Sequence, residues 1–527
     1  MIGNYLIGGA WLLTLAVLLL LRFGGRKNLG SVPLLLRLGA ILLTLATALL
    51  AYHLLRPDFS LYYAFQKTAL DVAWYYRLAA LWAGQEGALL LWAWATLLTA
   101  LAVSERKGWK EPPVRAAQGI VLLFALFLLT ALLFTPPFRP TMDGIREEAL
   151  RNNVSPEQML AFYANMGLYK EGFIDGNGVS PALLSPWMAL HPPLVFIAYA
   201  FIALVSAASL LHLHRGSDLS FVRPWARAAW LLLTLGVGMG GAWAYGELSY
   251  GGYWSWDPVE VASLIPWLAL TAFLHPRPGT LGPFAGASTL VLILYATFIT
   301  RSGIVESAHA YAGTPLAPLL LGAVLLSGSA TIILTARRWR PTFEERLSSQ
   351  AGLALATQVA LLATALVLTA GLTVPLIEKL TGGAAEPLPP EFFNLYSLPL
   401  VLVLLVLAAL CTLVPLVRFL LPLALGMGAL ALGLYTLRPD IYLVALLPLT
   451  LFASLASGLG LLLDLRKGAF KGYHLIHLGV AILLLGVVLS SALAQEGGVA
   501  YQYPQEVGVK KRVLGHVLEL EDLLVEE

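Results

Sequence analysis

Residues 115–135 read RAAQGIVLLFALFLLTALLFT, an apolar run whose only charge is its first residue. A helix rises about 1.5 Å per residue, so about 20 residues cross the ~30 Å hydrocarbon core of a bilayer. A strand of a membrane barrel needs only about 10 residues, and polar and apolar residues alternate along it. This run shows no such alternation. The run therefore predicts a membrane-spanning α-helix.

Runs of the same kind fill the chain. Of its 527 residues, 58% are hydrophobic and 12% are charged, against about 25% charged in soluble proteins. The mean hydropathy is +0.78. This composition predicts an all-α integral membrane protein, a polytopic bundle of about fourteen transmembrane helices. The predicted spans are residues 3–22, 32–54, 85–104, 115–135, 187–213, 224–246, 257–275, 282–301, 315–338, 350–372, 396–418, 420–437, 440–464 and 472–495.

Basic residues gather in alternate loops, which orients the bundle because cytoplasmic loops are enriched in Lys and Arg. The basic clusters are Arg22, Arg26 and Lys27; Arg106, Lys107 and Lys110; Arg215, Arg223 and Arg227; Arg337, Arg338 and Arg340; and Arg466, Lys467 and Lys471. We predict that these loops are cytoplasmic and that the N-terminus lies outside a cytoplasmic (inner) membrane. The loops predicted to lie outside are 56–84, 136–186, 246–260, 302–314 and 373–395.

Residues 1–495 form the predicted transmembrane domain, and residues 496–527 the start of an extracytoplasmic segment. Partial alternation between Val507 and Leu524 predicts that this segment is rich in β-structure. The net charge of +3 gives no sign of nucleic-acid binding. The one cysteine, Cys411, excludes an internal disulfide and a CxxC redox pair.

The most unusual outer loop, residues 250–260, reads YGGYWSWDPVE. Asp257 and Glu260 have the spacing of a helix capping box and predict the start of a span. Interfacial anchoring accounts for one or two aromatic rings, but four rings around a Gly-Gly pair leave the backbone open to close approach. We predict a planar, apolar ligand here, with an aromatic partner surface as the alternative. The predicted binding residues are Tyr250, Gly251, Gly252, Tyr253, Trp254 and Trp256.

The predicted topology sorts the nine histidines by side. His191 and His309 lie outside, on either side of the Trp-rich loop in sequence, and two imidazoles could ligate a haem iron. His275 and His477 lie at the inner ends of two spans, so a second bis-histidine site is geometrically allowed. His474, one turn before His477, is the rival ligand.

Simpler roles compete for each histidine. A histidine at a helix C-terminus, such as His275, often only complements the helix dipole. His212 and His214 lie beside Arg215 and are interpreted as residues of the membrane interface. His53 and His516 are interpreted as structural.

The segment GGYWSWDPVE, residues 251–260, resembles the WWD signature of the haem-handling membrane proteins that include CcmF, CcmC and CcsA. Four further segments, in order along nearly the whole chain, resemble the CcmF type. These are YYRLAALWAGQEG at 75–87, ALHPP at 189–193, TRSGIVESAH at 300–309 and HLGVA at 477–481. The family usually continues into a longer periplasmic domain and one more span, before which this sequence ends. Tyr250 and Tyr253 stand where the family often has Trp.

The resemblance implies roles for single residues. His191 and His309 match the family's periplasmic haem-ligand pair, and His275 and His477 its transmembrane pair, which ligates a stable haem b. Trp254, Trp256 and Asp257 match the WWD core, the platform on which substrate haem reacts.

The implied activity is that of a cytochrome c haem lyase. Such a protein takes haem from a periplasmic chaperone of the CcmE type and promotes its thioether attachment to the CxxCH of apocytochrome c. CcmH-type partners would deliver the apocytochrome, and the internal haem b would act as reductant, with quinol as a candidate donor. The alternatives are a haem exporter or chaperone loader of the CcmC or CcsA type, and an ordinary secondary transporter with interfacial tryptophans.

Overall fold

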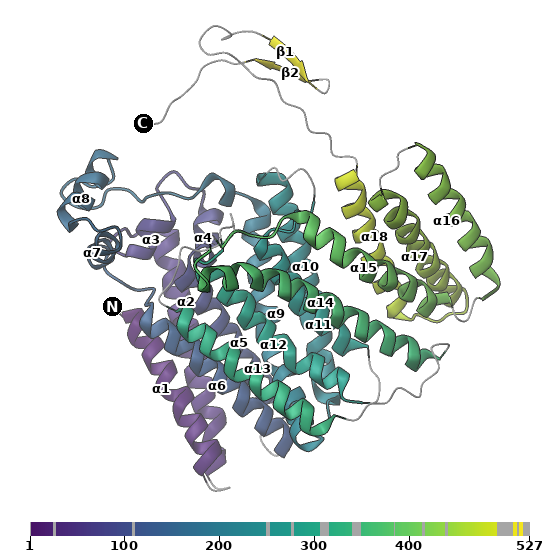
Figure 1. The fold of residues 1–527 in the computed structure, drawn as a ribbon. Helices are drawn as coiled ribbons and strands as arrows, with labels where there is room; N and C mark the ends of the chain where they lie inside the picture. Colours follow the sequence, from purple (N-terminus) through teal and green to yellow (C-terminus); the bar gives the residue numbers. More distant parts are fainter. Residues whose placement is uncertain are drawn as a thin grey trace. The chain divides into compact units, whose positions relative to one another are not determined.

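The computed structural model describes residues 2–24, 28–107, 111–248, 253–275, 279–305, 316–339, 349–383, 385–413, 417–437, 441–492, 510–513 and 516–519 (Figure 1). Its elements are α1 Ile2–Phe23, η1 Asn28–Ser31, α2 Val32–Leu55, α3 Tyr62–Lys67, α4 Trp74–Ala83, α5 Gln85–Lys107, α6 Pro112–Phe134, α7 Thr141–Arg151, α8 Pro156–Asn165, η2 Pro181–Leu183, α9 Pro186–Arg215, η3 Ser220–Val222, α10 Arg223–Glu247, α11 Pro258–Leu274, α12 Leu281–Arg301, α13 Ala317–Arg338, α14 Gln350–Leu380, α15 Pro390–Leu413, α16 Val417–Leu437, α17 Ile441–Arg466, α18 Gly472–Ala492, β1 Lys510–Val513 and β2 His516–Glu519.

The fold is an all-α polytopic membrane bundle, as predicted. Within the described ranges, 12 helices are long and apolar enough to cross a membrane. The other two predicted spans coincide with α11 and α16, whose described apolar stretches are shorter. Most helix ends fall within a few residues of the predicted ones. The exceptions are α14, which continues to Leu380, and α15, which begins at Pro390, so that both helices extend into the predicted loop 373–395.

The chain forms two compact units, each of which is described by itself. The first contains residues 1–243 and 256–407, and the second residues 244–255 and 408–527. In the first unit α11 packs against α12 and α14, and α9 packs against α5, α6 and α12. In the second, α17 packs against α16 and α18. The strands β1 and β2 pair antiparallel, in agreement with the β-structure predicted for the C-terminal segment.

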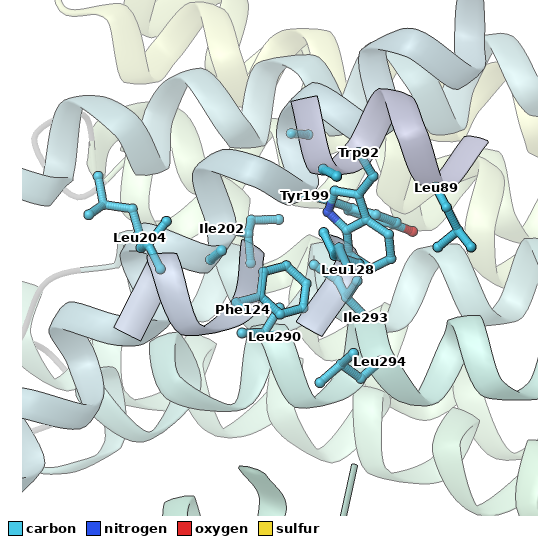
Figure 2. Packing of buried hydrophobic residues seen from close by; sticks show 14 of the residues in the cluster. Leu89, Trp92, Phe124, Leu128, Tyr199, Ile202, Leu204, Leu290, Ile293 and Leu294 are labelled. Carbon is cyan, nitrogen blue, oxygen red and sulfur yellow. The ribbon is translucent and has the colours of Figure 1, made fainter. Parts of the chain in front are cut away.

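Aromatic packing fixes α9, the helix that carries His191, within the first unit. The Trp92 ring of α5 is fully buried, with its centroid 5.4 Å from Phe124 of α6 and 5.5 Å from Tyr199 of α9 (Figure 2). Ser206 of α9 adds a polar contact, donating to the Gly286 carbonyl of α12 at 2.7 Å. Hydrogen bonds of this kind stabilise helix pairs in membranes, where burial of apolar surface contributes little.

Helices also form in the loops predicted to lie outside. We call α3, α7 and α8 with their connections the helical cap, which has its own small cluster of buried side chains: Phe59, Phe65, Ile145, Ala149, Met159 and Tyr163. Glu148 accepts hydrogen bonds from Tyr62 Oη at 3.1 Å and Tyr163 Oη at 2.9 Å. Burial, reinforced by this carboxylate, raises the pKa of both tyrosines.

Replacing Tyr163 by phenylalanine is expected to destabilise the helical cap by about 1–2 kcal/mol, because Glu148 and Gln66 each lose a partner. Hydrogen exchange in peptides from α7 and α8 should become faster. The matched control is Tyr169→Phe, because the Tyr169 hydroxyl makes no hydrogen bond to a described residue. This change should leave exchange in both helices as it is in wild type. Equal exchange in both variants would show that the network contributes little.

A pH series extends the same test. Since folding raises the pKa of Tyr62 and Tyr163, their contribution is fully present below about pH 10 and is lost as the pH rises further. In wild type, the protection factors of the helical cap, which correct for the intrinsic rise of exchange with pH, should therefore fall above that pH.

Candidate haem-binding site

Three histidines make the same hydrogen bond. In His191, His275 and His477, Nδ1 lies 2.9, 2.7 and 2.8 Å, respectively, from the backbone carbonyl oxygen four residues earlier. A carbonyl oxygen can only accept, so Nδ1 carries the proton and Nε2 of the neutral ring bears the lone pair. Metal-bound histidines usually have this arrangement, which fixes tautomer and ring orientation together. The three imidazoles therefore fit axial ligation of a haem iron.

Histidines interpreted as structural or interfacial have different partners. Nδ1 of His53 lies 3.0 Å from the Asp58 carboxylate, and Nδ1 of His212 lies 2.7 Å from the Ser217 carbonyl in the loop after α9. Among the histidines whose side chains the structure describes, only the three above bond to the carbonyl one helical turn before. His516 is described only as part of β2.

The rival ligand His474 is engaged elsewhere. Its side chain is 3% exposed, and its Nε2 lies 3.2 Å from Oδ2 of Asp464 on α17. The imidazole lies directly against Gly460, where an added Cβ would come within 2.5 Å of Cε1. His477 is half-buried on a neighbouring face of α18. The contacts of His474 therefore favour His477 as the ligand.

His191 lies in the first turns of α9, where proline shapes the helix. Pro192 has no N–H for the Met188 carbonyl, which instead accepts from Trp82 Nε1 of α4 at 3.1 Å. The His191 ring lies 6.1 Å from the Trp243 ring of α10 and is tilted by 32°. The ring also lies beside Gly240 of α10, where an added Cβ would be in ordinary van der Waals contact, 3.7 Å from Cδ2 of His191. The two helices thus hold His191 in a defined direction.

Trp256 is held in a strained conformation. Its φ is +62°, in the left-handed region that bulky side chains rarely adopt. Its Nε1 donates to Oδ1 of Asn394 at 2.7 Å, and its ring stacks on Phe393 with centroids 5.6 Å apart and planes 17° apart. Both partners lie near the start of α15 and were not found from the sequence. An asparagine among aromatic residues, in EFFNLYS at 391–397, was the only signal.

Asp257 begins α11, as predicted from the capping box. Its Oδ1 accepts from the Val259 N–H at 2.9 Å, and Oε2 of Glu260 accepts from the Asp257 N–H at 3.3 Å. These bonds fix where the span starts relative to Trp256. The structure thus gives Asp257 a structural role, and its predicted part in the haem platform stays a prediction.

For the remaining predicted site residues, the structure gives the unit to which each described one belongs and, for two of them, one contact. Tyr253 and Trp254 belong to the second unit, where the Tyr253 N–H donates to Ser490 Oγ of α18 at 3.3 Å. His275 belongs to the first unit, and Gln358 of α14 donates to its carbonyl at 2.8 Å. His477 belongs to the second unit. The predicted residues outside the described ranges are Tyr250, Gly251, Gly252 and His309.

In the comparison with known proteins, the family model and the most similar relatives agree on one family. Residues 82–305 match the family described as cytochrome C assembly protein. The cytochrome c-type biogenesis protein CcmF of Pseudomonas fluorescens is 30% identical over 493 residues, which cover 86% of this chain and 70% of that protein. The CcmF of Escherichia coli K12 is 31% identical over 357 residues, covering 64% of this chain and about half (51%) of that protein.

A solved structure has the same fold. The chain named "Cytochrome c Heme Lyase CcmF" superposes with a TM-score of 0.68 at 24% identity, covering 93% of this chain and 77% of that one. At this identity the match concerns the fold alone. With the sequence relatives, it shows that the chain is a multi-pass membrane protein of the CcmF family of cytochrome c-type biogenesis proteins.

Proposed function

We propose that this protein is a haem lyase of the cytoplasmic membrane, with its N-terminus, helical cap and Trp-rich loop on the outer side. It would take haem from a periplasmic chaperone of the CcmE type and promote its attachment to the CxxCH of apocytochrome c, presented by a CcmH-type partner. The observation that carries this proposal is the shared Nδ1 hydrogen bond of His191, His275 and His477. Membership of the CcmF family of cytochrome c-type biogenesis proteins supports a role in the same process.

In this proposal, each of the two histidine pairs would hold a different haem. His191 and His309 would hold the substrate haem at the loop that carries Trp254 and Trp256. His275 and His477 would hold a resident haem b. When bound, that haem would supply one-electron chemistry that keeps the substrate iron reduced, with quinol as a candidate donor.

The reaction adds a cysteine S–H across a haem vinyl group. Sulfur bonds to the carbon next to the ring, hydrogen goes to the terminal carbon, and no leaving group forms. The protein therefore needs to hold the vinyl group and the thiol in register. His191, fixed by its Nδ1 bond, and Trp256, fixed by Asn394, would provide that orientation.

Complementation tests the function. A bacterial host without its own CcmF, but with the other maturation proteins, would express this chain and a reporter c-type cytochrome. The expected result is a reporter that retains haem after denaturing electrophoresis. If the reporter stayed haem-free in this host, while the chain restored haem loading of the chaperone in a second host without its own CcmC, the protein would be a transporter or chaperone loader instead.

A further inference from the structure

A cavity of about 440 Å³ lies at the end of α9, on the side of the membrane predicted to be cytoplasmic. Its walls come from the end of α9, the loop that follows, and α10, α11, α12 and α14, all of the first unit. A smaller space of about 200 Å³ adjoins it, since His212 and Gly279 line both. Sites for small ligands usually have a volume of about 300–1,000 Å³, so the larger cavity has the size of a binding site.

Two arginines line these spaces. Arg223 begins α10 and lines the larger cavity, and Arg338 ends α13 and lines the smaller one. Neither guanidinium donates a hydrogen bond to a described residue. Gly216, with a φ of +74°, lets Arg338 approach, since a Cβ there would come within 2.5 Å of Nη2. Planar guanidinium groups bind phosphate through paired hydrogen bonds, so the two arginines offer donors to such an anion.

A carboxylate offsets part of this positive charge. Asp218 also lines the larger cavity, but it accepts hydrogen bonds from both the N–H and the hydroxyl of Ser220. With two arginines against one engaged carboxylate, the described lining keeps a positive excess.

The same lining contains two hydrogen-bond acceptors. Gln358 is 1% exposed, and its Nε2 donates to the carbonyl oxygens of Ala272 at 3.1 Å and His275 at 2.8 Å. These bonds fix the amide orientation, and its Oε1 accepts from no described residue. His212 donates through Nδ1 to the Ser217 carbonyl at 2.7 Å, so Nε2 of the neutral ring carries the lone pair. Both acceptors fit hydroxyl groups of a ligand.

We propose that this cavity binds a phosphate ester whose head group carries free hydroxyls. Arg223 and Arg338 hold the phosphate, while Gln358 and His212 accept from the hydroxyls. Basic pockets between membrane helices on the cytoplasmic side are typical sites for the head groups of acidic lipids, and phosphatidylglycerol has this chemistry. A soluble glycerol phosphate shares it. The proposal does not depend on haem binding or on lyase activity.

Binding of phosphatidylglycerol should stabilise the end of α11. Gln358 lines the cavity and also binds two carbonyls of the last turn of that helix. A ligand that binds only the folded state raises the melting temperature in proportion to its saturation. Delipidated protein should therefore melt at a higher temperature in nanodiscs that contain phosphatidylglycerol than in nanodiscs of phosphatidylcholine alone.

Native mass spectrometry tests the proposal on the full chain. The protein is equilibrated with equal amounts of phosphatidylglycerol and phosphatidylcholine, and the lipids retained per chain are counted. Wild type should retain phosphatidylglycerol selectively. The double change Arg223→Gln and Arg338→Gln should weaken its retention at least about 10-fold, from the loss of charge-assisted hydrogen bonds. The matched control is Arg227→Gln, an exposed arginine one turn further along α10 that is not among the described lining residues. Equal losses in both variants, or no selectivity in wild type, would overturn the proposal.

Further probes distinguish the source and the head group. Stabilisation of the delipidated protein by glycerol 3-phosphate as strong as that by phosphatidylglycerol, and absent from the double variant, would support a soluble ester. Phosphatidic acid, which lacks the hydroxyls, should be retained less than phosphatidylglycerol by wild type. His212→Asn, which keeps a donor for Ser217, should reduce that preference. Equal retention of both lipids by wild type would overturn the hydroxyl assignment.

A salt series in wild type decides the charge assignment if the double variant does not fold. Retention of phosphatidylglycerol should fall as ionic strength rises, because salt screens the attraction between arginine and phosphate. Retention that is independent of salt would overturn the role of Arg223 and Arg338.

Discussion

Alanine at position 191 is expected to abolish covalent attachment of haem to the reporter cytochrome, while the proposed resident haem stays in place. Replacing groups that only orient a metal ligand costs about 10- to 100-fold in affinity or activity. Loss of His191 itself should therefore cost more than about 100-fold. The measurement is the yield of thioether-linked haem in the complementation assay, normalised to the amount of protein in the membrane.

The control for this change is His214→Ala, an exposed histidine at the other end of the same helix. It should leave both yield and resident haem unchanged. Imidazole in the growth medium should partly restore His191→Ala by occupying the vacated ligand position. Full maturation by His191→Ala without imidazole would show that this residue is no haem ligand in the reaction.

Alanine at position 275 or 477 is expected to remove the resident haem, again by more than about 100-fold in occupancy. A single change should suffice, because a bis-histidine iron that loses one axial ligand is held only by the other and by porphyrin contacts. The measurement is haem content per chain after purification in detergent. If this haem is the reductant, as proposed, its loss should also lower maturation, an effect that a chemical reductant should relieve.

His474→Ala discriminates between the two neighbouring candidates on α18. It removes a side chain that pairs with Asp464 and fills the space over Gly460. The free energy of unfolding should therefore fall by about 2–4 kcal/mol. Resident haem should remain, at nearly the wild-type amount below the melting temperature. A haem-free His474→Ala beside a haem-loaded His477→Ala would reverse the ligand assignment.

The membrane spans and the start of α11 were predictable from sequence because each depends on local chemistry. An apolar run of the right length predicts a span wherever it occurs. The capping box at Asp257 and Glu260 is complete within four residues. The helices of the helical cap were missed because α7 and α8 are short and lie in segments interpreted as loops.

The contacts that orient the candidate site were not predictable. Asn394 lies 138 residues from Trp256 in sequence, and the aromatic residues around it do not indicate which distant residue it contacts. The positive φ of Trp256 contradicts the usual preference of a bulky residue and depends on this distant partner. Likewise, the choice between His474 and His477 depended on Asp464 and Gly460 of the preceding helix. Contacts between residues so far apart in sequence can be identified only from the folded structure.

The optical spectrum of the purified protein tests the central claim most directly. After expression with ample haem and purification in mild detergent, the reduced protein is predicted to show the sharp bands of a low-spin, bis-histidine haem b. Extraction into acidified organic solvent should release that haem, at about one per chain, because it is not covalently bound. A chain that is folded, membrane-inserted and active in complementation, yet contains no haem, would contradict the proposed resident haem site.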